Sequence, residues 1–400
     1  MNPPPPSALD PLDDAVTLRL PHRVRFTRRA FDPANPTLVD VLRRDANSPQ
    51  TQKLFVVVDQ GFVHANPALQ QQIRNYHTAH RDALPLLADC RALPGGEAAK
   101  NDLSLLEALL SDIHRLGLDR QSYLLVIAGG ALLDMAGFAA AVAHRGVRLV
   151  RMPTTTLAQC DSGVGVKNSV NMFGKKNFIG TFAVPHAVVN DLNFLDTLSD
   201  RDYRAGLSEA VKVALLKSAS MFEQIEQAAD ALAQRDARAA DPIWQASAQH
   251  HYNHILHAGD PFELTAARPL DFGHWAAHKL EPMSNFELRH GEAVAIGLAV
   301  DMHYAALAGL CPQPLADRVT ALLARLGFTL THPAMRDIDA LLAGLEEFRE
   351  HLGGQLTITF VKAPGQPIDV HRIDFALMRQ AIEKLLESSH KIASNQAPPS

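Results

Sequence analysis

Short apolar runs alternate with segments of helical periodicity along the first half of the chain. The apolar runs have the length of buried strands, and the segments between them are long enough for crossover helices. Alternation of this kind is typical of a parallel sheet covered by helices, so we predict a Rossmann-like α/β domain. The expected strands are residues 54–59, 84–90, 123–130, 147–153 and 187–191, and the expected helices are residues 66–79, 103–117 and 131–146.

The pattern changes after residue 191, where helical periodicity dominates. A helix is expected to begin near residue 196, and one late apolar run at residues 356–362 predicts a short strand. We therefore expect an α/β domain over residues 15–195 and a mainly α-helical domain over residues 196–388. The further expected helices are residues 220–235, 241–257, 270–281, 290–309, 315–326 and 374–388.

The two ends of the chain have a different composition. Residues 1–14 are rich in proline and residues 389–400 in serine, proline and asparagine, so we expect both to be disordered. Residues 16–31 alternate apolar and basic side chains, which predicts an edge strand or a hairpin. The N-terminal segment lacks the basic and apolar regions of a signal peptide, and no apolar run is long enough to span a membrane. A cytoplasmic location is therefore expected.

Composition narrows the possible partners. The chain has 400 residues, with 38 Lys and Arg against 43 Asp and Glu, so its formal net charge is −5. That balance has no basic excess for nucleic acid or an anionic membrane, and we expect neither partner. The three cysteines are widely spaced and odd in number, which argues against a disulfide framework. Nineteen histidines are many, so each candidate histidine needs a specific reason.

The stretch from Arg151 to Asn177 follows a predicted buried strand and has the composition of a functional loop. Gly163 and Gly165 allow a close approach of the backbone to a ligand. The alternative interpretation is a solvated loop that happens to carry several lysines. Thr154 and Thr155 lie just beyond the strand end, where ligands bind in open α/β sheets. Lys167, Lys176 and Asn177 offer cationic and amide donors suited to a phosphate, and Asp161 lies in the same run.

A glycine pair, Gly129 and Gly130, ends one predicted strand and opens a helix. Free N–H groups at a helix N-terminus attract a diphosphate, although the motif is not GxGxxG and also fits ordinary strand-to-helix turn chemistry. We expect Asp134 in the first turn of that helix, where it is either a cofactor contact or an acid that complements the helix dipole. Asp59 at an earlier strand end, and Glu97 with Lys100 in the next turn, are candidates for the ribose and adenosine side.

The helical half carries a possible metal set. Glu209 precedes Lys212 by three residues on one helix face, and His274 precedes His278 by four. His290 opens a further helical segment. One glutamate and two histidines form a known zinc set that leaves positions open for substrate oxygens. An HxxxH pair is also common without a metal, so a purely structural role remains the alternative.

Five segments of the chain have a distinctive sequence in a distinctive order. They are GGALLDMAGFAAAVAHRG, MPTTTLAQCDSGVGVKNSVNMFGKKNFIGTF, RAGLSEAVKVALL, DFGHWAAH and LRHGEAVAIG. With these segments the chain resembles the 3-dehydroquinate synthase-like sugar phosphate cyclases, over roughly residues 54–310. Their sequence looks closest to the branch encoded in the Ebo operon and is similar to 2-epi-5-epi-valiolone synthases.

The resemblance implies a dehydroquinate synthase-like fold and a set of residue roles. The implied metal ligands, for zinc or cobalt, are Glu209, His274 and His290. Arg145 matches an arginine that reaches a substrate phosphate in the neighbouring subunit, which implies a homodimer. The implied NAD-binding positions are Asp59, Glu97, Lys100, Gly129, Gly130, Asp134, Thr154 and Thr155. The implied contacts to a small sugar phosphate substrate are Asp161, Lys167, Lys176, Asn177, Lys212 and His278.

The chain departs from the family where dehydroquinate synthases hold the substrate carboxylate with a lysine and an arginine. Asn253 aligns with that lysine and Ala267 with that arginine, although Arg268 is adjacent. Asp271 replaces the asparagine that usually precedes FGH, and an acid there would repel a carboxylate. We therefore expect a substrate without a carboxylate at that end, such as sedoheptulose 7-phosphate. The family's late phosphate-binding lysine is not evident either, and His351 or Arg349 is a candidate replacement.

Three alternatives stay open at this point. The chain could be an authentic 3-dehydroquinate synthase in which Arg268 replaces the missing clamp. It could be a metal-dependent polyol dehydrogenase of the same architecture, against which the clustered lysines argue. It could also be a catalytically silent nucleotide-binding scaffold, although a silent protein has no need to keep Glu209, His274, His290, Lys212 and Lys176 together.

Overall fold

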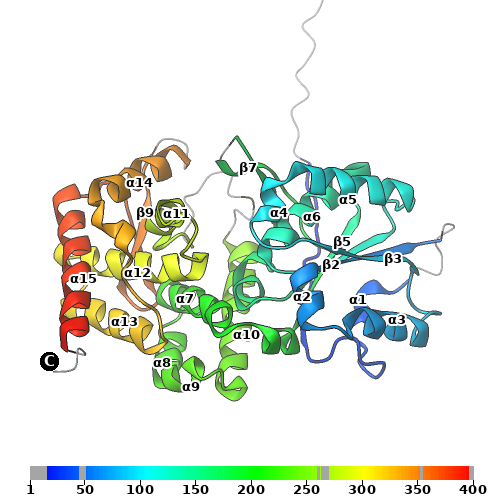
Figure 1. The fold of residues 1–400 in the computed structure, drawn as a ribbon, viewed down its shortest axis with the longest axis horizontal. Coiled ribbons are helices and arrows are strands. Elements are labelled where there is room, and N and C mark those ends of the chain that lie inside the picture. The colour runs from blue at the N-terminus through cyan, green and yellow to red at the C-terminus, as the bar shows by residue number, and fades with distance from the viewer. Residues whose placement is uncertain are drawn as a thin grey trace, which may run out of the picture.

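A six-stranded parallel sheet forms the first part of the molecule (Figure 1). The computed structural model describes residues 16–44, 51–173, 175–258, 262, 270–351 and 355–395. Because the strands are parallel, their carboxyl ends meet at one edge, and the predicted α/β fold class is confirmed. In spatial order the strands are β1 (Val24–Thr27), β8 (Ala187–Asp191), β5 (Arg148–Pro153), β4 (Tyr123–Ala128), β2 (Lys53–Asp59) and β3 (Leu86–Leu93).

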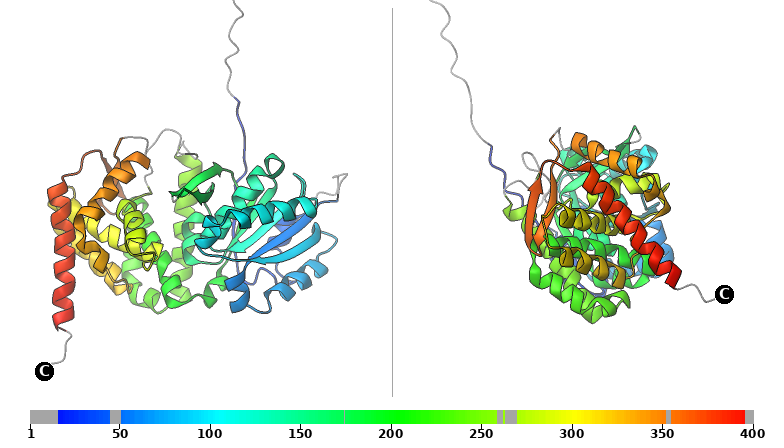
Figure 2. Two further views of the ribbon diagram at one scale, coloured as in Figure 1. Left: turned by 45° about the horizontal axis from the view of Figure 1, so that its top comes forward. Right: turned by 90° about the vertical axis from the view of Figure 1, so that its left-hand side faces the viewer.

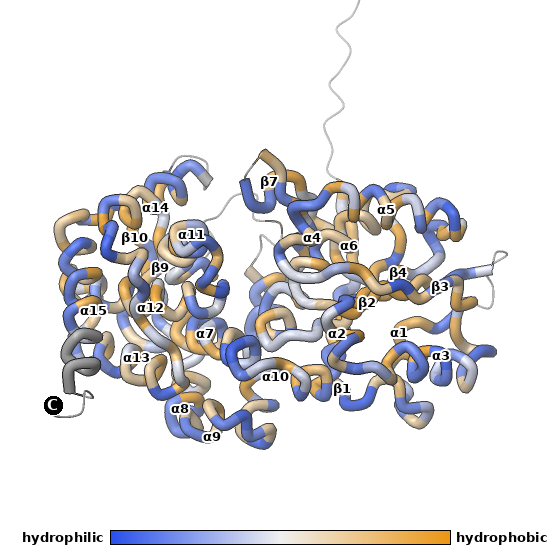
Figure 3. The backbone as a smooth tube through the Cα atoms, viewed as in Figure 1, coloured by the Kyte–Doolittle hydropathy of each residue, from blue (hydrophilic) through white to orange (hydrophobic). Residues whose placement is uncertain are grey.

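Helices cover both faces of this sheet (Figure 1). Side chains of β2, β4 and β5 alternate between the two faces, so each face has its own apolar cluster. One face packs on α1 (Thr37–Leu42), α2 (Gln60–Ala65) and α3 (Leu69–Ala79). The other packs on α4 (Ala98–Asn101), α5 (Leu103–Arg115) and α6 (Gly130–Val142). In Figure 3 the tubes of α3 and α5 alternate between hydrophilic and hydrophobic colours, as expected for helices with one buried side.

The second part of the molecule is a helical bundle around α12, which is buried along most of its length. A short antiparallel pair, β9 (Ile358–Ala363) and β10 (Gln366–Val370), packs against it. Figure 1 and the left-hand view of Figure 2 place α15 at the end opposite the sheet. The helices are α7 (Asp200–Lys217), α8 (Ala219–Gln227), α9 (Ala229–Ala233), α10 (Ala237–His257), α11 (His274–Met283), α12 (His290–Leu307), α13 (Gln313–Arg325), α14 (Ile338–His351) and α15 (Phe375–Asn395). None of the described helices is long and apolar enough to cross a membrane.

The stretch from Arg151 to Asn177 is not simply a loop, which corrects the expectation from its composition. After β5 the chain makes a π-helical turn over Ala158–Ser162 and then forms a hairpin. The hairpin strands, β6 (Lys167–Met172) and β7 (Lys175–Phe182), pair antiparallel. The ladder satisfies backbone groups that a loop would have to leave to water. The glycines and lysines obscured this pairing in the sequence.

The edge strand expected within residues 16–31 is confirmed, as the short strand Val24–Thr27 at the sheet edge. Several smaller expectations about the elements need correction. The helix expected over residues 220–235 is divided into α8 and α9, and α14 was not foreseen. Asp134 lies in the second turn of α6, because that helix begins at Gly130. The last helix continues to Asn395, beyond its expected end at residue 388. The expected tail at residues 1–14 lies outside the described residues.

Candidate active site

The candidate metal ligands come from three helices and meet in the bundle. Glu209 is on α7, and His274 and His290 are the first residues of α11 and α12. Their potential ligand atoms all lie within 4.8 Å of one another. Oε1 of Glu209 is 3.5 Å from Nε2 of His274 and 3.8 Å from Nε2 of His290. The predicted set is therefore brought together from positions far apart in the sequence.

Close backbone packing brings the histidine-bearing ends of α11 and α12 to the cluster. Gly273, which caps α11, has a φ of 78°, a left-handed conformation that glycine adopts without strain. A Cβ atom on Gly297 would lie 2.0 Å from the carbonyl oxygen of Gly273. The two helices can approach this closely only because both contact positions are glycine. Asp301 completes the junction by accepting hydrogen bonds from the Gly273 N–H (3.0 Å) and from Nε1–H of Trp275 (2.8 Å).

Each candidate histidine ligand has an acceptor behind its ring. Nδ1 of His274 lies 3.1 Å from the carbonyl oxygen of Phe272, and Nδ1 of His290 lies 2.6 Å from Oε1 of Glu281. A carbonyl or carboxylate oxygen can only accept, so both Nδ1 atoms carry a proton and both Nε2 atoms face Glu209. This arrangement is typical of histidines that bind metal through Nε2. Glu281 was not singled out from the sequence, and only its position three residues after His278 on α11 hinted at it.

The residues present fit a zinc or cobalt ion. Neither carboxylate oxygen of the fully buried Glu209 has a hydrogen bond of good geometry. Metal–ligand bonds of about 2.0–2.2 Å at tetrahedral angles separate two ligand atoms by roughly 3.3–3.6 Å, close to the spacing between Glu209 and His274. Imidazole and carboxylate are ligands of borderline metals. His278 is exposed, with its ring 5.5 Å from that of His274, so it lies on the open side of the cluster.

Charges around the cluster are balanced inside the protein. Nζ of Lys212 lies 2.5 Å from Oε2 of Glu209, and both side chains are buried. Burial alone would lower the pKa of Lys212, but the carboxylates of Glu209, Asp161 and Asp271 outweigh it and raise that pKa. Burial, and then Lys212, hold the pKa of His274 well below its usual range. Lys212 therefore stays a cation and His274 stays a neutral imidazole, which is the form that binds metal.

The hairpin joins the predicted cofactor turn through a hydrogen-bonded network. The ammonium group of Lys100 contacts Oδ2 of Asp134 (2.8 Å) and Oδ1 of Asn177. Asn171 on β6 donates to Oε1 of Glu97 (2.9 Å) and accepts from the N–H of Asn177 (2.8 Å). Five polar residues from two strands and two helical turns are thus connected. Asn171 was not anticipated as a member of this network.

Lys176 extends this network to the helical part of the molecule. It is half-exposed, and its ammonium group forms an ion pair with Glu281 on α11. The same group lies 3.9 Å from Oε1 of Glu97 and 5.6 Å from the ring centre of Phe286. Lys167 begins β6 and is exposed. Both of these predicted phosphate-type lysines are therefore within reach of solvent, and Lys176 is linked through Glu281 to the metal-type cluster.

Arg151 on β5 organises the segment between the π-helical turn and β6. Its fully buried guanidinium donates to the carbonyl oxygens of Gly165 (2.8 Å) and Lys167 (2.9 Å). It also donates to the carbonyl oxygens of Ser162 and Gly163 and to Oδ1 of Asn168. This fixed fork of donors holds the backbone on which Asp161 and Lys167 are carried. A basic residue inside an otherwise apolar strand was the available signal in the sequence.

Asp161 has a histidine partner that sequence reasoning did not identify. Nδ1 of His251, on α10, lies 3.1 Å from Oδ1 of Asp161. Asn253, two residues further on, is exposed and accepts a hydrogen bond from Gln249 (2.9 Å). The helix thus brings His251 to Asp161, whereas the hydrogen bond of Asn253 is with Gln249 on the same helix. Ala267 and Arg268 lie outside the described residues.

The remaining cofactor candidates lie at the carboxyl edge of the sheet. Asp59 caps α2 by accepting from the N–H groups of Gly61 (2.7 Å) and Phe62 (3.1 Å). A Cβ atom on Gly130 would lie 2.7 Å from Oγ of Ser162. These contacts set the strand ends against the π-helical turn. The glycine pair Gly129 and Gly130 also lies beside Thr154, which bonds to β4, and Thr155.

Two predicted positions are not brought into this site. Arg145 is exposed beyond the far end of α6, about 20 Å from Gly130 along a helix of 13 residues. Its predicted reach into a neighbouring subunit stays a prediction. Arg349 lies on the surface of α14 and pairs with Glu346, and the side chain of His351 lies outside the described residues.

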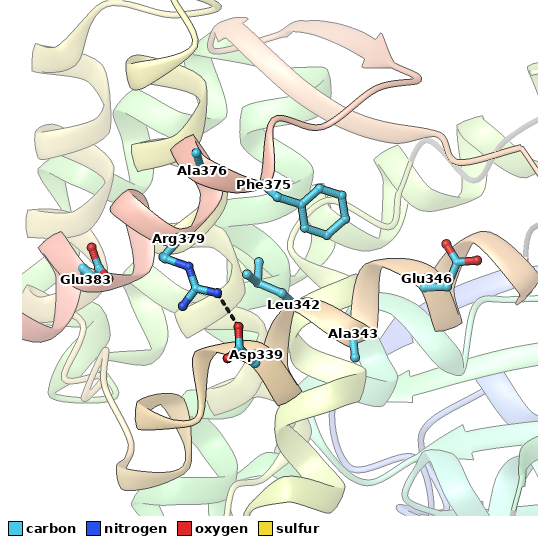
Figure 4. A pocket seen from close by; sticks show the side chains of 8 residues that line it. All are labelled: Asp339, Leu342, Ala343, Glu346, Phe375, Ala376, Arg379 and Glu383. Atoms are coloured by element: carbon cyan, nitrogen blue, oxygen red, sulfur yellow. Dashed lines mark hydrogen bonds and ion pairs between the residues drawn. The ribbon is translucent and has the colours of Figure 1, made fainter.

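A hollow of about 590 Å³ lies elsewhere, between α14 and α15 (Figure 4). Apolar side chains of Leu342 and Phe375 line it, and Arg379 pairs with Asp339 at its edge. It contains none of the predicted site residues, so it has no part in the chemistry of the candidate site.

Known proteins match the chain over most of its length. Residues 91–205 match the family 3-dehydroquinate synthase N-terminal, and residues 206–347 match 3-dehydroquinate synthase C-terminal. A 2-epi-valiolone synthase of Actinosynnema mirum is 35% identical over 298 residues, covering 74% of this chain and 77% of that protein. A 3-dehydroquinate synthase of Paracoccus denitrificans is 36% identical over 312 residues, covering 74% and 81%. The chain belongs to the 3-dehydroquinate synthase family of cyclases.

A solved structure agrees with this assignment. It is ValA, a 2-epi-5-epi-valiolone synthase from Streptomyces hygroscopicus subsp. jinggangensis with NAD+ and Zn2+ bound. Its TM-score is 0.84 at 26% identity, and the match covers 94% of this chain and 100% of that chain. The predicted fold, a Rossmann-like domain followed by a helical domain, is therefore confirmed. The resemblance to the Ebo-operon branch stays a prediction.

Proposed function

We propose that this protein is a sugar phosphate cyclase that acts on a heptulose phosphate without a carboxylate, such as sedoheptulose 7-phosphate. It would eliminate phosphate and close a carbocycle by an intramolecular aldol reaction. The observation that carries the proposal is the joining of two site halves. A buried Glu–His–His cluster is linked, through Glu281, to Lys176 on the exposed hairpin.

We propose NAD and zinc or cobalt as the resident groups. NAD would be held by Asp59, Glu97, Lys100, Gly129, Gly130, Asp134, Thr154 and Thr155, and when bound it supplies reversible hydride transfer that turns one substrate hydroxyl transiently into a ketone. The metal would be held by Glu209, His274 and His290, and when bound it polarises hydroxyl and carbonyl oxygens. The ValA structure, with NAD+ and Zn2+ bound, supports both assignments.

The remaining residues bind and orient the substrate. Lys167, Lys176 and Asn177 present cationic and amide donors from the hairpin, which suits the leaving phosphate. Lys212 stays protonated, so it can donate to a substrate oxygen beside Glu209, while Asp161 accepts from a hydroxyl. His278 approaches from the open side. We propose that an oxygen of the phosphate itself takes the proton removed during elimination.

The choice of a substrate without a carboxylate rests on the charge at one end of the site. Asp271 acts electrostatically on Lys212, which already faces Glu209 and Asp161. A substrate carboxylate entering beside these acids would meet repulsion instead of a cationic clamp. The exposure of Asn253 supports the same view, because the helix offers no cation there. His251 is instead the basic side chain that α10 turns toward Asp161.

A second candidate, authentic 3-dehydroquinate synthase, is favoured by relatives of that name at up to 36% identity. A dehydrogenase is a weaker candidate, because two glycerol dehydrogenases share the fold at only 14% and 18% identity. We propose a homodimer as well, in which Arg145 contacts the substrate phosphate of the partner subunit. Its exposed position outside its own site is compatible with that role.

Phosphate release from sedoheptulose 7-phosphate, compared with release from the carboxylated dehydroquinate precursor, tests the proposal. Both reactions would contain NAD and zinc or cobalt, and absorbance at 340 nm would be followed in parallel. We expect phosphate only from the former and no accumulation of NADH, because the hydride is returned. Release only from the carboxylated precursor would mean a dehydroquinate synthase, and net NADH would mean a dehydrogenase.

A further inference from the structure

Glu281 lies between the two halves of the candidate site without belonging to either predicted set. It is on α11, its side chain is 4% exposed, and each carboxylate oxygen has a different partner. Oε1 lies 2.6 Å from Nδ1 of His290, and Oε2 forms an ion pair with Lys176. One partner is a candidate metal ligand in the helical bundle, and the other is a hairpin lysine from the sheet-bearing part of the chain.

A purely structural role explains this arrangement poorly. Ordinary ion pairs are available for anchoring α11. One joins Lys279, two positions before Glu281, to Glu347 on α14. Glu281 is instead buried, where an ionised carboxylate needs full compensation. The N–H of His290 at one carboxylate oxygen and the ammonium group of Lys176 at the other supply that compensation. The carboxylate is therefore an anion shared between a ligand ring and an ammonium group.

We propose that Glu281 is a positioning residue that couples metal binding at His290 to anion binding at Lys176. The carboxylate fixes the His290 ring with Nε2 toward Glu209 and makes that nitrogen a stronger electron-pair donor to a metal ion. The same charge holds the ammonium group of Lys176 at the open side of the cluster. When a substrate phosphate pairs with the ammonium group of Lys176, the carboxylate of Glu281 is less neutralised by Lys176 and acts more strongly on His290. Binding of the phosphate therefore strengthens binding of the metal, and binding of the metal strengthens binding of the phosphate.

This inference rests on the proposed metal site but not on the identity of the substrate. Zinc affinity of the metal-free protein, measured by competition with a chromophoric chelator, tests it without any turnover. Glu281→Gln keeps an acceptor for Nδ1 but removes the charge, and we expect zinc to bind about tenfold more weakly. Glu281→Leu removes both, and the expected loss is about a hundredfold. Lys279→Met on the same helix is the matched control and should leave zinc affinity unchanged.

Lys176→Met tests the coupling itself, and it keeps the test available if the Glu281 variants do not fold, because Lys176 is half-exposed. With the ammonium group gone, the whole Glu281 charge acts on His290, so zinc should bind about threefold more tightly or better. In the Glu281→Gln background the same substitution should have a clearly smaller effect. In the cobalt-loaded protein, the visible absorption band should shift in Glu281→Gln and not in Lys279→Met.

Zinc affinities of both Glu281 variants within threefold of the wild type would overturn the proposal. Equal effects of Lys176→Met in both backgrounds would overturn the coupling. Wild-type protein that binds no zinc would remove the metal site itself, and with it this inference. Normal zinc behaviour in a protein that ignores sedoheptulose 7-phosphate would leave Glu281 in its role and refute only the proposed substrate.

Discussion

The two halves of the candidate site are built in opposite ways. The Glu209, His274 and His290 cluster lies in the helical bundle, where α12 is buried along most of its length. The hairpin that carries Lys176 and Asn177 is exposed along most of β7. The buried half is held in place by close packing, whereas the exposed half is open to solvent.

The charges in the two halves follow the same division. In the bundle, Lys212 and Glu209 are 2.5 Å apart and nearly inaccessible, so their charges compensate each other inside the protein. On the hairpin, Lys167, Lys175 and Lys176 face solvent, where salt screens them and a phosphate can reach them. The difference fits the proposal that one half orients reacting oxygens and the other binds a polyanion. Glu281 is where the two charge systems meet.

Loss of the metal from the buried half should cause the largest loss of activity. Dialysis against a chelator should lower phosphate release from the cyclase substrate by about a thousandfold, because metal polarisation contributes several kcal/mol at the transition state. Added zinc or cobalt should restore the rate, and magnesium should not, because it prefers a shell of oxygens. Full activity after verified metal removal would contradict the assignment of the cluster.

Arg151→Met should strongly destabilise the segment that carries Asp161 and Lys167. The substitution leaves several buried carbonyl oxygens without their donor, and we expect a loss of about 3–5 kcal/mol in the free energy of unfolding. Urea unfolding followed by circular dichroism measures it. Arg148→Met, on the same strand but partly exposed, is the control and should cost about 1 kcal/mol or less. Similar losses for both variants would show that burial of Arg151 is unimportant.

Asp301 gives the bundle a distinctive pH dependence. Burial raises the pKa of its carboxyl to about 7, despite the donors from Trp275 and Gly273. The folded protein then keeps a proton that the unfolded chain has lost, so stability is greatest below about pH 4 and falls as pH rises to about 7. This contribution changes by about 4 kcal/mol over that interval.

Unfolding free energies of the wild type and Asp301→Asn, compared at several pH values, would isolate this contribution. Their difference should vary between pH 4 and 7 and become constant above pH 7. Asp317→Asn, at an exposed position, is the control for loss of a surface carboxylate. A difference for Asp301→Asn that does not vary with pH would show that this carboxyl ionises normally in the folded protein.

The smallest expected effect lies on the hairpin. Phe178 is 52% exposed, with its ring centre 5.4 Å from that of Phe173. Phe178→Ala should change the free energy of unfolding by about 0.5 kcal/mol, whereas the fully buried Phe272→Ala should cost about 3–5 kcal/mol. Thermal unfolding of both variants measures the contrast. A large loss for Phe178→Ala would mean that the exposed half is as tightly packed as the buried one.

Site residues could be predicted from the sequence where their residue type and neighbouring motif were distinctive. Glu209, His274 and His290 were identifiable because their residue types and motif context are distinctive. Glu281, His251 and Arg151 were not identifiable, because each acts through a partner that only the fold brings near. These partners are His290 for Glu281, Asp161 for His251 and Gly165 for Arg151. Asn253, which aligns with the family's carboxylate-binding lysine, is exposed and bonds to Gln249 on its own helix.

The sequence by itself determined the alternation of strands and helices, the change to a helical second half and the family. Those features depend on local periodicity and on contiguous motifs. Only the tertiary structure decided that residues 158–182 form a π-helical turn and a hairpin, and that Lys176 meets Glu281 beside His290. Such contacts depend on long-range packing, including the close approach of Gly273 and Gly297, whose free energy is not encoded in any single segment.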